Sequence, residues 1–181
     1  MIDDDILIEC KACELHPRAG VLRLPNILTN ELNSSIIKAY CQLLSTANVV
    51  DKNKEWFGVI ITYREMYLGF GSDAWHEFMQ PKVKEFAAQN NLDLDILPPK
   101  NLFFVTVEYW DYMMQVIKQG KASLKQMLEK GRELNLSSNP IDKVFLIEQV
   151  LKKHFRVQSL DLSYLKNAHK VINIVTAELD S

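Results

Sequence analysis

The sequence predicts an α/β protein with a helical C-terminal part. Three apolar runs have the composition of buried β-strands: Ile6–Ile8, Trp56–Tyr63 and Leu102–Val107. The segments between these runs carry apolar residues at helical spacing, and further helical patterns follow the third run. The order strand, helix, strand, helix, strand and then helices is typical of an α/β core.

The first strand begins after an acidic turn formed by Asp3, Asp4 and Asp5. Residues 13–30 contain turn-forming residues, so we expect a loop there, with a short strand at Val21–Leu24. A helix is then predicted to begin at Asn33 or Ser34, since either side chain can cap a helix N-terminus. The buried stripe of this helix comprises Ile36, Tyr40, Leu43, Leu44 and Ala47.

The second strand is apolar almost throughout, which is typical of a strand buried on both faces. The turn at Gly69–Asp73 follows, and Ser72 or Asp73 is expected to cap a helix over residues 74–90. Two glycines before a helix can also cradle a phosphate on backbone N–H groups, but a simple turn is the commoner role. Pro98 and Pro99 then close the connection to the third strand.

The remaining sequence predicts helices and one terminal strand. A hairpin of helices over residues 110–118 and 123–134 is interrupted at Gly120, and "SSNP" predicts a helix start at residues 137–140. The helix that follows is expected over residues 141–155, a less regular segment over 162–170, and a strand over 171–177. We therefore expect an α/β core over residues 1–115 and a helical C-terminal region over residues 116–181.

Composition excludes several classes of protein. The 181 residues are 48% hydrophobic and 24% charged, and the net charge of −2 provides no general attraction for nucleic acid. The chain contains no apolar run long enough to span a membrane, and its acidic start lacks the basic region of a signal peptide. Three cysteines, an odd number, favour a cytoplasmic protein without a disulfide framework.

The segment "ILIECKACELH", residues 6–16, contains three overlapping motifs. Alternation of side chains along a strand places Glu9 and Lys11 on one face and Cys10 on the other. The same alternation separates Cys10 from Cys13, which argues against a redox pair. A zinc site would need His16 and a fourth ligand such as Cys41, so it is also disfavoured.

Glu9 and Lys11 have the chemistry of a metal-dependent hydrolase. A carboxylate binds a divalent cation, and a neighbouring ammonium group orients water and stabilises negative charge in the transition state. Lys38 and Gln42 follow on one face of the predicted helix, where they can approach this pair. The alternative is that Glu9 and Lys11 simply solvate an exposed strand face.

The ordered set of elements resembles the PD-(D/E)xK nuclease superfamily, which has a restriction-endonuclease-like mixed sheet flanked by helices. "ILIECKA" resembles the second motif strand, and "KAYCQLL" resembles the helix that follows it and contributes Lys or Gln to the site. "GVIITY" resembles the next core strand, and "NLFFVTVEYWDYM" the strand and helix that often follow. The resemblance extends over residues 3–115.

The resemblance implies a nuclease centre that hydrolyses phosphodiester bonds of DNA with Mg²⁺ or Mn²⁺. Lys11 would be catalytic with Lys38 and Gln42 in support, and Glu9 would bind the metal. The family places a further Asp on the preceding strand, whereas only eight residues precede Glu9, so we expect an N-terminally short core. Asp5 and the backbone carbonyl of Cys10 are the remaining candidate metal ligands.

A second hypothesis is a non-catalytic assembly protein derived from this fold. A chain that begins inside a sheet leaves a strand edge unpaired, which favours a homo-oligomer or a partner chain that completes the sheet. Two further groups are candidates for nucleic-acid contact, although core packing and a solvated helix face are their commoner roles. They are the aromatic residues Tyr109, Trp110 and Tyr112, and the basic residues Lys118, Lys121, Lys125, Lys130, Arg132, Lys152, Lys153 and Arg156.

Overall fold

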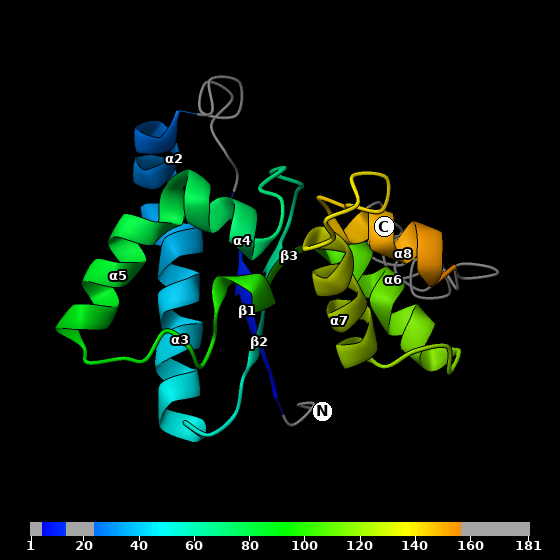
Figure 1. The fold of residues 1–181 in the computed structure, drawn as a ribbon, viewed down its shortest axis with the longest axis horizontal. Coiled ribbons are helices and arrows are strands. Elements are labelled where there is room, and N and C mark those ends of the chain that lie inside the picture. Colours follow the sequence, from blue (N-terminus) through cyan, green and yellow to red (C-terminus); the bar gives the residue numbers. More distant parts are fainter. Residues whose placement is uncertain (1–4, 14–23, 157–181) are drawn as a thin grey trace, which may run out of the picture.

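A computed structural model describes residues 5–13 and 24–156, and its centre is a three-stranded sheet (Figure 1). The strands are β1 (Ile6–Lys11), β2 (Phe57–Thr62) and β3 (Leu102–Thr106), in the order β1-β2-β3. Both strand pairs are parallel, so the predicted α/β class is confirmed, whereas the predicted mixed sheet is all parallel in the described residues. Thr62 is in register with Lys11 on one side and Thr106 on the other, so the three carboxyl ends meet at one edge.

The first connection contains a helix that begins earlier than predicted. Helix α2 (Pro25–Leu32) continues through the π-helical turn η1 (Asn33–Ile37) into α3 (Lys38–Val50). Pro25 is suited to the first helical position because its missing N–H has no intrahelical partner there. The predicted start at Asn33 or Ser34 is therefore wrong, since Leu28 and Leu32 already extend the buried stripe.

The second connection repeats this pattern of two helices around a π-helical turn. It consists of α4 (Gly71–Ala74), η2 (Trp75–Met79) and α5 (Gln80–Gln89), followed by the short 3-10 helix η3 (Pro99–Asn101). The helix begins before the predicted residue 74, and Asp73 lies inside the first turn, where its carboxylate accepts a hydrogen bond from the Phe70 N–H at 2.9 Å.

Helix α3 packs against one face of the sheet, and α5 packs against α3 on the same side, as Figure 1 shows. Parallel strands joined in one direction by right-handed crossovers place both connecting helices on the same face. The first hydrophobic cluster lies between this face and the helices. Its fully buried members include Leu28, Ile36, Tyr40, Leu44, Ile60, Met79, Leu97 and Leu102.

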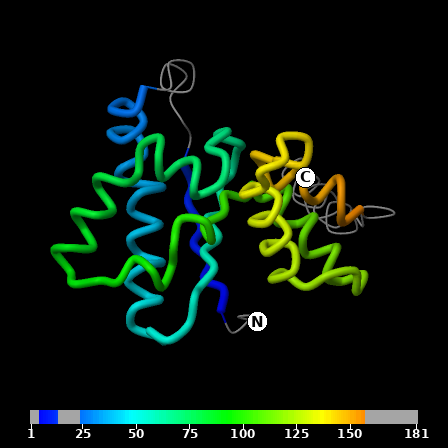
Figure 2. The backbone as a smooth tube through the Cα atoms, viewed as in Figure 1, coloured from blue at the N-terminus to red at the C-terminus, as the bar shows by residue number. Residues whose placement is uncertain are grey.

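The C-terminal helices cover the opposite face (Figures 1 and 2). They are α6 (Val107–Lys118), α7 (Leu124–Asn135) and α8 (Ile147–His154), and the predicted break at Gly120 is confirmed by its φ of 66°. A second hydrophobic cluster lies between these helices and the sheet and joins them directly. Its fully or nearly buried members include Ile6, Phe57, Val59, Phe103, Val105, Met113, Met127, Leu128, Val150 and Leu151.

Helix α8 begins at Ile147, so the predicted start near residue 141 is wrong. The Asn139 side chain accepts a hydrogen bond from the Ile141 N–H at 3.1 Å and donates one to Asp142 at 2.7 Å. These bonds close a local turn, which competes with helix formation. The chain then places Val144 in the second cluster before the helix begins.

Polar contacts fasten α7 to the amino ends of the strands. Lys125 forms an ion pair with Asp5. Asn101 is fully buried and donates to the Trp56 carbonyl at 3.0 Å, while Arg132 donates to the Asn101 side chain at 2.9 Å. Partial burial acts to raise the pKa of Glu55, but hydrogen bonds and charges from Lys100, Asn101 and Arg132 outweigh it and hold that pKa below its usual range.

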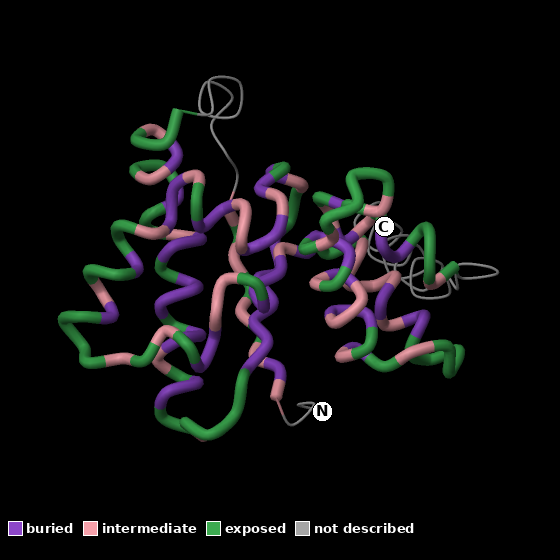
Figure 3. Tube along the Cα trace, in the orientation of Figure 1, coloured by how far each residue is buried: buried purple, intermediate pink, exposed green. Residues whose placement is uncertain are grey.

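Three predicted segments, at residues 21–23, 162–170 and 171–177, lie outside the described residues. No helix in the described part of the chain combines the length and apolar character that a membrane span requires. Figure 3 shows the buried residues gathered between the sheet and the helices on either side of it.

Candidate functional site

The structure brings Glu9, Lys11 and Gln42 together beside the carboxyl end of β1. Leu7, on the same face of β1 as Glu9 and Lys11, packs against the first hydrophobic cluster and therefore faces α3. The Lys11 Nζ lies 2.8 Å from the Glu9 Oε1 and 2.9 Å from the Gln42 Oε1. The ammonium group is thus held by one residue of its own strand and one residue of the crossover helix.

This cluster is only partly covered. The side chains of Lys11 and Glu9 are 20% and 29% exposed, so the ion pair is open to a ligand while the helix shields one side of it. Gln42 accepts from Lys11 through its carbonyl oxygen, so it orients the lysine without neutralising it. One positive charge therefore lies next to one negative charge at the edge where ligands of parallel α/β sheets bind.

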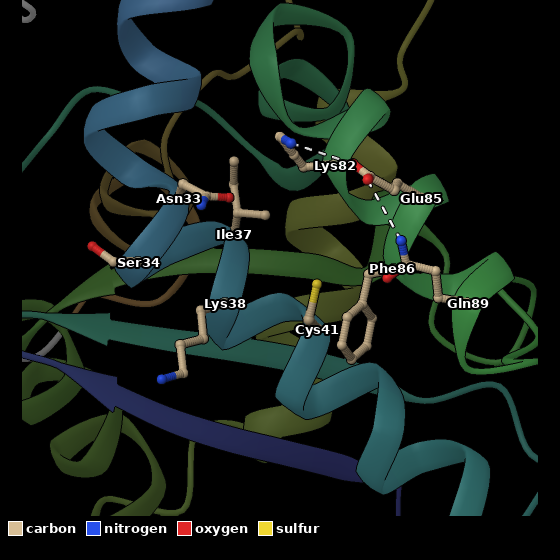
Figure 4. A pocket seen from close by; sticks show the side chains of 9 residues that line it. All are labelled: Asn33, Ser34, Ile37, Lys38, Cys41, Lys82, Glu85, Phe86 and Gln89. Carbon is tan, nitrogen blue, oxygen red and sulfur yellow. Dashed lines mark hydrogen bonds and ion pairs between the residues drawn. The ribbon is translucent and has the colours of Figure 1, made fainter.

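Lys38 lies one helical turn before Gln42 on α3 and is exposed. Figure 4 shows the Lys38 and Cys41 side chains leaving α3 in different directions, at the side of a groove between α3 and α5. The groove has a volume of about 380 Å³, and Lys82 on its far wall pairs with Glu85 at 3.2 Å. Burial raises the pKa of the Cys41 thiol to about 11, so Cys41 is neutral at physiological pH.

Asp5 does not join Glu9. Asp5 immediately precedes β1 and Glu9 is the fourth residue of this strand, so the two lie roughly 13 Å apart at about 3.3 Å per residue, and the Asp5 carboxylate pairs with Lys125 of α7. A single cation cannot contact both carboxylates, so the suggested metal site of Glu9 with Asp5 is corrected. Asp5 instead helps to fasten α7 to the sheet.

The cysteines lie apart, as alternation along β1 predicts. The Cys10 side chain is exposed, whereas Cys13 packs against the first cluster with its Sγ 4.0 Å from the Met66 Sδ. Burial raises the pKa of the Cys13 thiol, and a hydrogen bond to Ser35 and the charge of Lys11 oppose this only in part. Both are free thiols in the structure.

The described residues do not form a complete site for Mg²⁺ or Mn²⁺. No group of three His, Cys, Asp or Glu side chains within residues 5–13 and 24–156 is arranged to hold a metal ion. Glu9 supplies one carboxylate, which is already paired with Lys11, and Cys10 contributes at most its backbone carbonyl. Hard divalent cations require several oxygen ligands, so this set does not fit them by itself.

Most other residues that we considered for nucleic-acid contact have structural partners. Tyr109, Trp110 and Tyr112 are half-buried against the second cluster. Several lysines and arginines of the C-terminal helices are paired within the protein: Lys125 with Asp5, Lys130 with Glu133, Arg132 with Glu55, and Lys152 with Glu148. Gly71 packs against Pro99 and Leu102, so close packing explains why this position is a glycine, and a phosphate-binding role is not needed to explain it.

The structure also reveals exposed side chains that the sequence did not single out. Tyr63 and Tyr67, in the loop after β2, are 66% and 68% exposed, and Arg64 lies between them in sequence. Tyr63 ends an apolar run and therefore resembled a buried strand residue. The positive φ of Tyr67, 52°, has no signal in the sequence, since tyrosine rarely adopts it.

No protein-family model, curated protein or solved structure matches this chain.

Proposed function

We propose that this chain is a nuclease-like domain that binds and helps to hydrolyse nucleic-acid phosphodiester bonds at Lys11, with DNA as the expected substrate. The observation that carries the proposal is the position of the Lys11 ammonium, between Glu9 of the same strand and Gln42 of the crossover helix. The resemblance of residues 3–115 to the PD-(D/E)xK superfamily implies this combination of strand and helix residues. It also implies the restriction-endonuclease-like fold, which we propose for the α/β core.

Each residue has a distinct task in this proposal. Lys11 donates a hydrogen bond to a phosphate oxygen and stabilises the negative charge that develops there, since a fixed cation in a partly covered site is already oriented for that charge. Gln42 holds the lysine in place, and Lys38 lies one turn away as a second cation for the phosphate backbone. Glu9 is the carboxylate that remains for Mg²⁺ or Mn²⁺ once the phosphate engages Lys11.

Hydrolysis requires at least one more acidic ligand than the described residues provide. We therefore propose that the active species gains that ligand from outside the described residues, either from this chain or from a second one. In its absence the cluster would bind a phosphate group without cleaving it.

Nicking of a supercoiled plasmid and of circular single-stranded DNA, each in Mg²⁺, in Mn²⁺ and in EDTA, tests the proposal. We expect nicking by the unaltered protein with either cation, and a loss of about 10²–10³-fold in Lys11→Met, since removal of one preorganised donor to a developing charge has this effect. Glu9→Gln should abolish the nicking that requires Mg²⁺ or Mn²⁺, because it removes the carboxylate proposed to hold the cation. Lys82→Met removes a lysine from an exposed ion pair on α5 and should nick as the unaltered protein does.

Circular dichroism of each variant separates loss of function from loss of fold. Equal nicking by the unaltered protein, Lys11→Met and Glu9→Gln would contradict the assignment of the site. Absence of nicking in every cation would overturn hydrolysis by this chain.

A second candidate function is assembly through the edge of β1. In the described part of the sheet β1 pairs only with β2, and Ile8 on this strand is 41% exposed. An unpaired strand edge with an exposed apolar side chain favours strand addition.

Sedimentation velocity tests this candidate. A homo-oligomer formed through β1 should dissociate at about tenfold higher concentration in Ile8→Lys, because a lysine on the edge strand opposes pairing. Val49→Lys is the matched control, since Val49 is 84% exposed at the end of α3. A monomer at all concentrations, or an equal effect of both variants, would exclude assembly through this edge.

A further inference from the structure

The loop between β2 and α4, residues 63–70, lies beside the proposed site. Lys11 and Thr62 are register partners on adjacent parallel strands, and the loop begins at the next residue, Tyr63. The middle of the loop also reaches the segment that leaves β1, since the Met66 Sδ contacts the Cys13 Sγ at 4.0 Å. A polymer bound at Lys11 would therefore pass close to this loop.

Buried side chains and local hydrogen bonds anchor the loop to the rest of the protein. Met66 and Leu68 are 5% and 2% exposed and belong to the first hydrophobic cluster. The Thr62 hydroxyl donates to the Arg64 carbonyl at 3.0 Å, and the Glu65 carboxylate accepts from the Tyr67 N–H at 2.7 Å. These contacts fix a backbone that alternates between buried and exposed residues (Figure 3).

Tyr67 occupies a conformation that costs free energy. Its φ of 52° is in the left-handed region, which is strained for a residue that has a Cβ. The conformation turns the ring outward between two buried neighbours, Met66 and Leu68. The anchored loop therefore holds an exposed aromatic ring near the carboxyl edge of the sheet.

Cations accompany the exposed rings. The Arg64 guanidinium lies 5.8 Å from the centre of the Tyr63 ring. Tyr67 shares a groove with Phe145, which is 53% exposed and carries the Lys143 ammonium 5.4 Å from its ring centre. Aromatic rings beside cations match the bases and phosphates of a nucleic-acid strand.

The acidic residues of the same groove set the orientation of such a strand. Asp73 and Glu77 line it together with Tyr67, and the Asp73 carboxylate already accepts hydrogen bonds from Phe70 and Asn135. Phosphates are repelled from that wall, so they are expected beside Arg64 and Lys143, with the bases directed toward the rings.

We propose that Tyr63 and Tyr67 stack on the unpaired bases of a single-stranded nucleic acid that leads to Lys11. The inference rests on the proposed function and defines its substrate class. Stacking requires exposed base faces, which a double helix covers with neighbouring base pairs, so two protruding rings beside a phosphate site favour a single strand over a duplex.

Fluorescence anisotropy in EDTA, where no metal-dependent cleavage occurs, tests this inference. The probes are a labelled oligothymidylate, a labelled oligouridylate and a DNA duplex of the same length. We expect Tyr63→Ala and Tyr67→Ala each to weaken oligothymidylate binding about tenfold, since stacking contributes about 1–3 kcal/mol per base. Tyr63→Phe and Tyr67→Phe should restore binding because they retain the ring.

The salt dependence separates the two kinds of contact. Arg64→Gln should reduce the slope of log affinity against log salt concentration, because arginine neutralises a phosphate. The tyrosine variants should keep that slope, because tyrosine carries no charge to neutralise one. Comparison of the two single strands decides between DNA and RNA. Thermal melts of each variant, together with the phenylalanine variants, exclude unfolding as the cause of a loss.

Unchanged binding in both alanine variants, or tighter binding of the duplex, would overturn the inference. An oligomer that dissociates in Tyr63→Ala with no binding of either strand would identify the loop as a protein interface and would also overturn it. Failure of the nicking experiment leaves tyrosine-dependent binding in EDTA intact, so the two proposals fail separately.

Discussion

Replacing Phe103 with alanine is expected to destabilise the protein by about 3–5 kcal/mol, which is typical of a fully buried phenylalanine. Phe103 is 0% exposed in β3, and its ring packs against Phe70 at a centroid distance of 5.5 Å and against Phe57 at 6.2 Å. The ring also approaches Gly131 of α7. The substitution therefore opens a cavity where the sheet, the start of α4 and α7 meet.

Urea unfolding monitored by circular dichroism measures this loss. Phe104→Ala is the matched control, since Phe104 is the next residue of β3, faces the other cluster and is only partly buried. We expect a smaller loss of unfolding free energy in the control. Equal losses in the two variants would contradict the packing described for the second cluster.

Gly71→Ala is expected to cost about 3 kcal/mol through a steric clash with the backbone. A Cβ at this position would lie 2.4 Å from both the Leu102 Cβ and the Pro99 carbonyl oxygen. Neither atom belongs to the flexible end of a side chain, so the start of α4 must move away from β3. The midpoint of urea unfolding should fall accordingly.

Gly120→Ala separates this clash from backbone strain. Gly120 has a φ of 66°, but within residues 5–13 and 24–156, apart from Gly120 and its two chain neighbours, no atom lies within 4 Å of the position of an added Cβ. Alanine there should cost only about 1–2 kcal/mol, the penalty of the left-handed conformation. A larger loss for Gly120→Ala than for Gly71→Ala would show that close packing is not the reason for glycine at residue 71.

The sequence predicted the strands because their signal is local. The β2 segment is buried along its whole length, so its continuous apolar run could only be satisfied between two layers. The helix starts were harder to predict. Pro25 falls within the loop expected over residues 13–30, although proline also fits the first turn of a helix. Asn139 caps a single turn instead of a helix. In both cases the burial of distant side chains decides between two locally acceptable structures.

The same contrast applies to the candidate site. Alternation along β1 sets the face on which Lys11 lies, and helical spacing sets the face of α3 on which Gln42 lies. Both patterns are short-range, and packing of α3 on β1 brings the two side chains together. The partner of Asp5, in contrast, is Lys125, which is far away in sequence and reaches it only when α7 packs on the sheet. The exposure of Tyr67 depends on the anchoring of its neighbours, so no pattern of residue types could predict it.

The two faces of the sheet become covered at different stages of synthesis. The first face is covered by α3, on which α5 packs. Both helices lie between the strands in the sequence, so this half can assemble as soon as β3 is made. The second face is covered only after α7 and α8. A nascent chain that has reached Thr106 therefore exposes Phe57, Val59 and Phe103 to the solvent. We expect the yield of folded protein to depend on how quickly translation supplies the remaining helices, or on a chaperone that covers these side chains until then.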